Sequence, residues 1–448
     1  MKPAIFKAYD IRGLYPQELD APGALAIGRA VARKLGPGAV AVGFDMRTSA
    51  DALREAFVTG LRSEGADVID IGRVATPILY FATTTLGAVG GAMITASHNP
   101  GAYNGFKLCG PRAVPIGIES GLRDIRDAAL AFEGQPTPAA RGSLRSESVK
   151  DRYYASLLEL FPARPRLRAV IDAGNGIAGE AYGGLIDRLP LNATRMYFEP
   201  DGSFPNHEAD PLKHENLEDL QRAVRAEGAD LGIAFDGDGD RIGVVDGKGR
   251  ILWGDQLMVL LAGDIIKTRP GATIIADVKA SQVLFDEIAR MGGTPLMWRT
   301  GHSLIKTKMA ETGAPLAGEM SGHIFFADRY YGYDDALYAA VRLLGIVARG
   351  TTSVAEMRDR LPAVVNTPEL RFPCSETRKF AAIDEVRARL RQAGAEMSDI
   401  DGVRVRTPDG WWLLRASNTQ DVLVARAEAR DEAGLNRLKA LLVEELSR

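Results

Sequence analysis

Residues 231–241 read Leu-Gly-Ile-Ala-Phe-Asp-Gly-Asp-Gly-Asp-Arg, an apolar run followed directly by three aspartates that single glycines separate. An apolar run that ends in a polar turn is typical of a buried parallel strand, and open α/β sheets bind their ligands at this end of their strands. Asp236, Asp238 and Asp240 repel one another in so short a turn unless a cation neutralises them. The turn therefore predicts a cation site at the edge of an α/β sheet.

The predicted ligands of this cation are all oxygens, and no cysteine lies nearby. Such a donor set favours Mg²⁺ or Ca²⁺ over zinc. An EF-hand would need Gly and Glu at the sixth and twelfth positions, where this chain has Arg241 and Gly247, so that class is excluded. A solvated acidic turn without a metal stays as the alternative.

Outward from this turn, strands and helices alternate in three similar cycles. We expect strands at 39–43, 67–71, 91–94, 167–172, 194–198, 231–235, 273–278, 295–298 and 315–317. We expect helices near 24–35, 50–64, 216–225 and 304–309, after Asn175, from Ser281, and from Thr76, which is expected to cap its helix.

A short sequence repeat supports this organisation: residues 62–67 (Arg-Ser-Glu-Gly-Ala-Asp) resemble residues 225–230 (Arg-Ala-Glu-Gly-Ala-Asp). Both segments close a predicted helix with Gly and lead into a predicted strand. We therefore expect three related α/β units, and each delivers one polar loop from the end of a strand.

The last part of the chain differs from these units. We expect strands at 369–372, 403–406, 411–414 and 422–427, with helices over 377–393 and at the C-terminus. A short turn, Pro408-Asp409-Gly410, joins two of the strands, which is typical of an antiparallel sheet in an α+β domain.

The expected fold class is thus α/β, with three similar α/β domains of mixed, mostly parallel sheets and a C-terminal α+β domain around a central active-site cleft. Residues 134–150 are rich in Pro, Gly and Ser and are expected to form a linker. The expected domains are 1–145, which carries Ser97, 146–250, which carries the aspartates, 251–365, which carries the loop 318–323, and 366–448, which carries the loop 415–419.

Composition excludes several classes of protein. In 448 residues, 55 basic and 58 acidic side chains leave a net charge of −3, so there is no basic surplus for nucleic-acid phosphates. The longest apolar runs, such as 257–263 and 86–96, are far shorter than the ~20 residues that cross a bilayer. The N-terminus lacks an apolar signal core, and two cysteines make no disulfide framework. We expect a cytoplasmic protein with neither nucleic-acid nor membrane partners.

Ser97 is the second candidate, at the junction of a predicted strand and the loop Thr95–Pro100. A serine in such a turn is usually a capping residue. A nucleophilic hydroxyl needs a base, a cation or a stored phosphoryl group beside it. His98 is adjacent in the sequence, and Lys107 can supply positive charge or a proton.

The other candidates are ordinary one by one. Glu319 and Ser321 offer acceptors for sugar hydroxyls, and His302 is either a core histidine or a site residue. A loop with a guanidinium, hydroxyls and backbone N–H groups suits a phosphate; its residues are Arg415, Ser417, Asn418 and Thr419. Neither G-x-x-x-x-G-K-[ST] nor a G-x-G-x-x-G after a strand is present, so nucleotide sites lose their main support.

These loops together resemble the α-D-phosphohexomutase superfamily, and within it the bacterial phosphomannomutase/phosphoglucomutase group. Four segments match its phosphoserine, metal, sugar and phosphate loops in order: Thr95–Pro100, Asp236–Arg241, Gly318–His323 and Arg415–Thr419. Further matches are Tyr9–Gly13, Tyr103–Lys107, Asp277–Lys279 and Thr300–Ile305, so the likeness spans almost the whole chain. Gln420 and Asp421 depart from the family, which usually has Glu or Thr and then Pro there.

The resemblance implies a phosphoryl relay between hexose 1-phosphate and hexose 6-phosphate, for glucose and mannose. Phosphorylated Ser97 would transfer its group to the sugar, a glucose 1,6-bisphosphate-type intermediate would turn around, and Ser97 would be phosphorylated again. Mg²⁺ would be held by the three aspartates and an oxygen on Ser97. Lys107 and Arg12 would neutralise the moving group, and Lys107 or His302 would manage the hydroxyl proton.

The same resemblance implies a set of substrate-binding residues: Tyr9, His98, Arg241, Lys279, Gly301, His302, Glu319, Ser321, Arg415, Ser417, Asn418 and Thr419. Its partners would be small phosphosugars, and we expect a monomer. The alternatives are a phosphoglucosamine mutase, or a catalytically silent phosphosugar-binding protein of the same fold.

Overall fold

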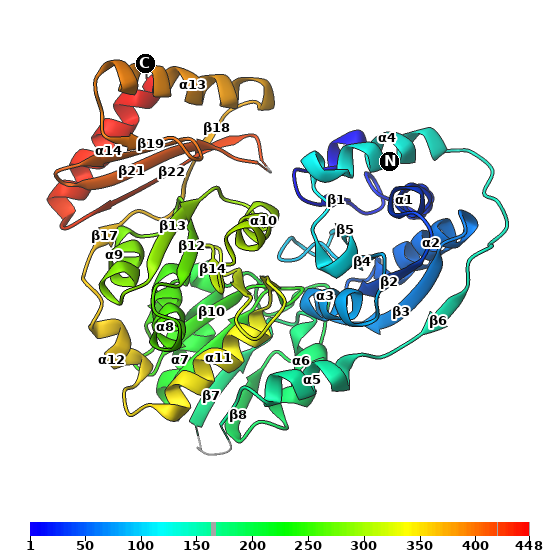
Figure 1. Cartoon of the computed structure of the whole chain (residues 1–448), viewed down its shortest axis with the longest axis horizontal. Helices are drawn as coiled ribbons and strands as arrows, with labels where there is room; N and C mark the ends of the chain where they lie inside the picture. The colour runs from blue at the N-terminus through cyan, green and yellow to red at the C-terminus, as the bar shows by residue number, and fades with distance from the viewer. Residues whose placement is uncertain (163–166, 419, 448) are drawn as a thin grey trace.

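The structure is a computed structural model that describes residues 1–162, 167–418 and 420–447. Four sheets follow one another along the chain, each with helices packed on it, and the C-terminal sheet lies at the upper left of Figure 1, apart from the N-terminal one at the right. The expected fold class is confirmed in its three α/β units and its C-terminal α+β unit.

The first sheet has the strand order β1-β5-β4-β2-β3-β6. Its strands are β1 (Ile11–Leu14), β2 (Ala39–Phe44), β3 (Asp67–Arg73), β4 (Gly90–Ile94), β5 (Tyr103–Cys109) and β6 (Leu144–Ser146). Its helices are α1 (Ala21–Leu35), α2 (Ala50–Ser63), α3 (Thr76–Thr85) and α4 (Leu122–Phe132). β3, β2 and β4 are parallel, whereas β5 and β1 are antiparallel to their neighbours.

The second and third sheets repeat this plan in the orders β11-β10-β9-β7-β8 and β13-β12-β14-β15-β16. The second contains β7 (Leu167–Asp172), β8 (Leu191–Met196), β9 (Leu231–Phe235), β10 (Ile242–Asp246) and β11 (Ile251–Leu252), with α5 (Lys150–Leu158), α6 (Ala178–Ile186) and α7 (Glu218–Glu227). The third contains β12 (Thr273–Asp277), β13 (Thr294–Trp298), β14 (Leu316–Gly318), β15 (Ile324–Phe326) and β16 (Tyr333–Asp334), with α8 (Gly254–Thr268), α9 (Gln282–Arg290), α10 (His302–Thr312), α11 (Ala336–Arg349) and α12 (Val354–Asp359).

In all three sheets a parallel strand is followed by a loop and then by the first antiparallel strand: β4 to β5, β9 to β10 and β14 to β15. These three connections carry Ser97, the aspartates and Glu319, so the three candidate loops are topologically equivalent.

The fourth sheet is antiparallel, in the order β17-β22-β21-β20-β19, and β18 also pairs with β22. It contains β17 (Val365–Asn366), β18 (Leu370–Pro373), β19 (Met397–Ser398), β20 (Val403–Thr407), β21 (Gly410–Ala416) and β22 (Val422–Ala429), with α13 (Glu376–Gln392) and α14 (Glu432–Ser447).

The apolar cores divide the molecule unequally. The largest cluster joins the three α/β units and includes Ile78, Leu185 and Leu343. The C-terminal unit has a separate core that includes Leu414 and Leu438. The first three units are therefore fastened to one another by continuous apolar packing, whereas the fourth is built on its own core.

Three local expectations are wrong. The edge strand β8 begins at Leu191, before the expected 194–198, because its register is set by pairing with β7 and its half-buried face gives weak alternation. The segment 134–150 contains β6, an exposed edge strand whose polar residues give no strand pattern. Thr76 is the first helical residue of α3, behind Ala75 as the cap, and its hydroxyl is used elsewhere.

None of the helices in the described part of the chain is long and apolar enough to cross a bilayer.

Candidate active site

The three aspartates lie in the tight loop between β9 and β10 and are almost completely buried. Each offers a carboxylate oxygen within 4.8 Å of the others. The intervening glycines are required here, because a Cβ on Gly237 would overlap the carbonyl oxygen of Ser97, and Gly239 has φ +75°. Only glycine lets the loop turn this tightly beneath the serine.

This loop suits a hard divalent cation. Asp238 Oδ1 is buried and accepts no hydrogen bond from the described residues, whereas Asp240 Oδ1, which also accepts none, forms an ion pair with His323 Nε2 at 3.4 Å. Unpaired buried carboxylate oxygens are costly unless a ligand or ion satisfies them. Burial, reinforced by Asp240 and Asp238, raises the pKa of Asp236 well above its usual range. A bound cation would remove this strain, and the oxygen donors favour Mg²⁺ over softer metals.

Ser97 lies against this loop, at the end of β4. Its Oγ donates a hydrogen bond to Asp236 Oδ2 at 2.7 Å and lies 3.2 Å from His98 Nδ1. Ser97 has φ +52°, an uncommon left-handed conformation for a residue other than Gly. The serine is completely buried. The strand-end loops of the first two units therefore meet through the Ser97 hydroxyl and the Asp236 carboxylate.

Lys107, on β5, holds the same cluster from the first unit. Its Nζ donates to Asp238 Oδ2 at 2.6 Å and also to Asp240. Burial alone would lower the pKa of Lys107, but Asp238 and Asp240 prevail and raise it above its ordinary value. Lys107 is therefore a fixed cation beside the aspartates rather than a ready proton acceptor.

Two more residues of the first unit hold these loops: Arg12 contacts the serine loop, and Thr76 contacts the aspartate loop. Arg12, on β1, donates through Nε to Asp10 at 2.7 Å and through Nη1 to Asn99 Oδ1 at 2.7 Å. Thr76 donates its hydroxyl to Asp238 Oδ2 at 2.5 Å, and its N–H reaches the Asp238 carbonyl at 2.9 Å. Thr76 was expected to cap its helix, and no sequence pattern indicated its contact with Asp238, 162 positions away.

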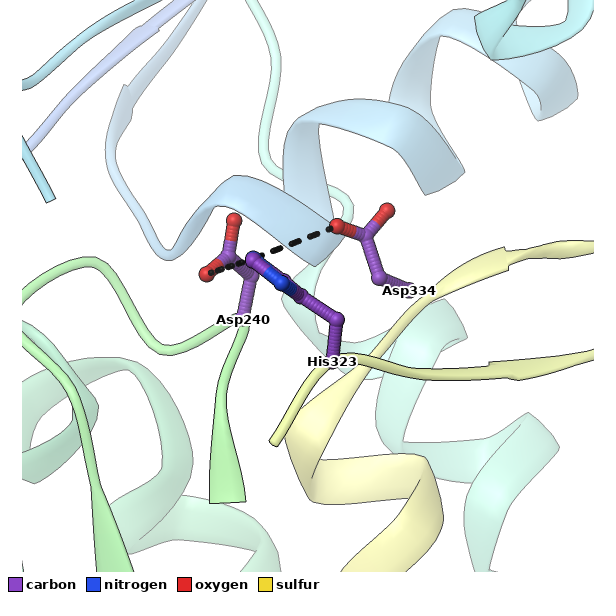
Figure 2. Close-up of side chains that lie close together, drawn as sticks. All are labelled: Asp240, His323 and Asp334. Atoms are coloured by element: carbon purple, nitrogen blue, oxygen red, sulfur yellow. Dashed lines mark ion pairs between the residues drawn. The ribbon is translucent and has the colours of Figure 1, made fainter. Parts of the chain in front are cut away.

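The sugar-recognition loop joins the aspartates through His323. Figure 2 shows the His323 ring between Asp240 and Asp334, with its Nε2 3.4 Å from Asp240 Oδ1 and 4.0 Å from Asp334 Oδ2. On its other side, Nδ1 lies 3.1 Å from Glu319 Oε2. Burial and Arg241 lower the pKa of His323, but Asp240 and Glu319 outweigh them and raise it to about 9. His323 is a buried cation that links the metal loop to Glu319.

Glu319 also accepts the backbone N–H of Gly301 at 2.7 Å, and the His323 hydrogen bond keeps the pKa of Glu319 below its usual value despite burial. Ser321 Oγ lies 3.0 Å from His323 Nδ1. His323, which was quoted in the motif but given no role, therefore keeps Glu319 ionised and also contacts the Ser321 hydroxyl.

His302 begins α10 and lies between two aromatic rings, with centroids 5.4 Å from Tyr9 and 5.9 Å from His323. Burial, then Lys306 and His323, lower its pKa well below the usual range. Its Nδ1 is buried and has no hydrogen-bond partner among the described residues. A neutral, unpartnered imidazole of this kind can accept a proton.

The fourth unit reaches the others through Asn418. Its Nδ2 donates to Tyr9 Oη at 2.5 Å and approaches the Thr300 carbonyl at 3.4 Å, while Tyr9 Oη itself donates to that carbonyl at 3.1 Å. Arg415 is held by Asp401 Oδ2, 3.0 Å from its Nε, and the same carboxylate accepts the Thr300 N–H. The first, third and fourth units thus meet at Thr300.

The buried Arg415 keeps one free end, because its Nη2 has no hydrogen-bond partner in the described part of the chain. Lys279 is also buried and interacts electrostatically with Arg415. Its Nζ lies 3.3 Å from Glu369 and 3.7 Å from Asp277. Ser417 lies in the same loop, where its Oγ accepts the Gln420 N–H at 3.2 Å. Thr419 lies outside the described residues.

The candidate residues therefore form a chain of contacts. Ser97, His98, Lys107 and the aspartates gather at one end, and Arg241 joins them through its N–H to Asp236 Oδ1 at 3.1 Å. Glu319, Gly301, His302, Tyr9 and Asn418 gather at the other, and His323 connects the two. Asp401, which positions Arg415, was not found from the sequence because nothing marks an aspartate in that turn.

The comparisons agree with this geometry. The family models of phosphoglucomutase/phosphomannomutase alpha/beta/alpha domains I, II and III match residues 3–131, 151–249 and 253–365. The model of the C-terminal domain of the same family matches residues 369–445. The chain belongs to the phosphoglucomutase/phosphomannomutase family.

Curated relatives resemble the chain over almost its whole length. Phosphomannomutase/phosphoglucomutase of Pseudomonas aeruginosa is 43% identical over 446 residues, which cover 99% of this chain and 95% of that protein. Phosphoglucomutase of Neisseria gonorrhoeae is 41% identical over 443 residues, which cover 97% and 95%. A solved family protein of Burkholderia thailandensis has a TM-score of 0.92 at 41% identity and covers 100% of this chain and 97% of its own.

Proposed function

We propose that this protein interconverts hexose 1-phosphate and hexose 6-phosphate, for glucose and mannose, through a phosphoryl group carried on Ser97 and a hexose 1,6-bisphosphate intermediate. The observation that carries the proposal is the Ser97 hydroxyl, 2.7 Å from Asp236 in a loop of three buried aspartates. The membership of the family supports the reaction class.

The covalent step exchanges one P–O bond for another. The Ser97 Oγ–P bond breaks as a bond forms between phosphorus and the free sugar hydroxyl oxygen; the sugar hydroxyl gives up one proton and the departing Oγ takes up one. The restored Ser97 hydroxyl then donates its hydrogen bond to Asp236, as in the present structure. Mg²⁺, held by Asp236, Asp238 and Asp240, would supply positive charge to the transferring group when bound. Lys107 and Arg12 supply fixed positive charge from the chain itself.

His302 is the group that we propose for the sugar hydroxyl proton. Lys107 is held protonated by two aspartates, whereas His302 is neutral and has a free Nδ1. A general base must carry a lone pair before the reaction, so His302 suits the role better. In the reverse step the protonated imidazole returns the proton.

The sugar and the distant phosphate are gripped by different loops. Glu319 accepts hydrogen bonds from sugar hydroxyls, with Ser321 beside it. The free Nη2 of Arg415 suits a phosphate oxygen. We propose that Ser417, Asn418 and Thr419 complete the phosphate-binding site. The rest of the active site would be lined by Lys279, Tyr9, Gly301, His98 and Arg241.

We propose the four domains of the sequence analysis with small changes at their boundaries. β6 and β17 straddle the expected limits at 145 and 365, and β11 lies just beyond the limit at 250 although it pairs with β10 of the second sheet. Boundaries after 146, after 252 and before 365 keep each sheet whole. We further propose a cytoplasmic monomer that handles small phosphosugars.

The test is a coupled assay with glucose 1-phosphate and mannose 1-phosphate, with glucosamine phosphate as the comparison. Turnover of both hexoses, with glucosamine phosphate at least tenfold slower, supports the proposal. Faster turnover of glucosamine phosphate would identify a phosphoglucosamine mutase, and turnover of none would leave a phosphosugar-binding protein.

A further inference from the structure

Four carbonyl oxygens of the Ser97 loop converge on one buried guanidinium, that of Arg47. Its Nη2 donates to the carbonyls of Ser97 at 2.7 Å and Asn99 at 2.6 Å. Its Nη1 donates to those of Pro100 at 2.9 Å and Tyr103 at 2.8 Å. Buried carbonyls need donors, and one arginine supplies them for the whole loop.

From this geometry we infer that Arg47 is the positioning residue of the phosphoryl-carrying loop: it fixes the left-handed conformation of Ser97 and turns the loop's amide N–H groups toward the phosphoryl group. The inference rests on the proposed function of Ser97 and names a residue that carries out no chemistry itself.

Peptide geometry gives the reason. In a trans peptide the N–H points opposite to the preceding C=O. Because Arg47 binds the carbonyls of Ser97 and Pro100, the N–H groups of His98 and Gly101 point away from the guanidinium. These two N–H groups lie on the side of the loop opposite the guanidinium, where backbone amides can bind an anion. The same contacts hold Ser97 at φ +52°, where its backbone is strained without support.

Arg47 is itself fixed on both sides. Its Nε lies 3.3 Å from Asp45 Oδ2, and both side chains are fully buried. From the second unit, the Phe204 ring lies 5.4 Å from the guanidinium carbon, and Gly202 packs against the Arg47 backbone. A guanidinium held in this way has little freedom to release the loop during a phosphoryl transfer.

The third unit contains a counterpart at the equivalent place. Asp45-Met46-Arg47 follows β2, and Asp277-Val278-Lys279 follows β12, the middle parallel strand of its own sheet. Asp277 Oδ1 accepts the N–H of Met320, in the sugar loop, at 3.3 Å. In both units an Asp-x-basic segment at the end of the central parallel strand therefore hydrogen-bonds to the backbone of the neighbouring loop.

Arg47→Lys tests the inference, with Arg47→Gln as the second variant should the first fail to fold. Neither side chain can present the planar fork that reaches four carbonyls. We expect kcat to fall about 100-fold, with KM changed by less than about 3-fold, because the loop is misplaced while the sugar and phosphate grips remain. Backbone amides of residues 95–103 should exchange hydrogen faster in the variant.

The matched control is Arg342→Lys, at a buried arginine of α11 in the third unit that donates to Asp328 at 2.9 Å and not to the Ser97 loop. It should lower the melting temperature with kcat kept within about 3-fold. Equal losses of kcat in the two variants, or unchanged exchange over 95–103, would overturn the inference. Wild-type protein that never carries phosphate on Ser97 would instead overturn the proposed function, and the exchange measurement would still report on Arg47.

Discussion

At the scale of single residues, the chemistry lies in a few buried groups whose charges are set by neighbours. Ser97 is neutral and strained, Lys107 is a fixed cation, and His302 is a neutral imidazole. Each state follows from burial together with the charges that face it. The predictions at this scale remove one group at a time.

Ser97→Ala should reduce mutase activity to background, because it removes the hydroxyl that donates to Asp236. Binding of glucose 1-phosphate, measured by calorimetry, should change less than about 3-fold, since Glu319 and Arg415 remain. Ser63→Ala, at a fully buried serine of α2, is the control and should keep its activity. Loss of binding by folded Ser97→Ala protein would make Ser97 a structural residue.

Asp238→Asn should lower kcat by about 10³-fold, which corresponds to about 4 kcal/mol of transition-state stabilisation. Excess chelator should abolish wild-type activity, and added Mg²⁺ should restore it. Asp246→Asn, at a buried aspartate of β10 outside the loop, should keep this metal dependence. Full activity in chelator would contradict the metal assignment.

Glu319→Ala should damage turnover of glucose and mannose phosphates by similar factors. The two hexoses differ only at the second carbon, and a site that accepts the sugar in two orientations grips hydroxyls that survive the reversal. We expect wild-type kcat/KM values for the two sugars to lie within about 100-fold, or about 3 kcal/mol. Glu311→Ala, at an exposed residue of α10, is the control, and selective loss of one hexose would contradict the symmetric grip.

At the scale of elements, three strand-end loops of one repeated unit supply different functions. The sequence predicted the strands β7 and β9 and the three loops because apolar runs and carboxylate spacing are local signals. Arg47, His323 and Asp401 were given no role, and Thr76 was wrongly given a capping role, because their actual roles arise from contacts between segments far apart in the chain. Secondary-structure propensity and the spacing of residues in the sequence do not predict such contacts, because these contacts form only when distant segments pack together.

The ion pairs of His323 with Asp240 and Glu319 predict how the stability of the protein depends on pH. The folded pKa of His323, at about 9, lies above its ordinary value of 6.5, so the stability that it contributes is fully present below pH 6.5 and is lost as pH rises through about 9. The loss should approach about 3 kcal/mol in metal-free protein, measured by denaturant unfolding. His323→Gln should flatten this decline, whereas exposed His214→Gln should not; an unchanged decline in His323→Gln would contradict the ion pairs.

At the scale of the whole molecule, three units share one apolar core and the fourth has its own. The segment 361–369 joins them. Asn418 contacts Tyr9 of the first unit, and Asp401, which holds Arg415 within the fourth unit, accepts the N–H of Thr300 in the third. A bisphosphate that turns around needs space, and phosphorylated Ser97 needs protection from water. The fourth unit packs on the third through Trp411 and Leu413, but none of its described residues takes part in the large shared core. A hinge at this smaller contact would meet both needs.

Glucose 1,6-bisphosphate should therefore reduce the radius of gyration in small-angle scattering, through a hinge near 361–369 with Arg415 as the latch. Arg415→Ala should abolish the reduction. Arg378→Ala, at an exposed arginine of the same unit paired with Glu385, should preserve it. Equal radii of wild-type protein with and without ligand would contradict the movement.

The most direct measurement concerns the phosphoryl group itself. Protein labelled with ³²P on Ser97, verified by peptide mass spectrometry, is mixed with unlabelled glucose 1-phosphate in a single turnover. The account predicts that the label leaves Ser97 at the rate of the reaction and appears on the sugar, first in the bisphosphate and then at the sixth position of glucose 6-phosphate. Formation of glucose 6-phosphate while the label stays on the protein, or leaves only as inorganic phosphate, would contradict it.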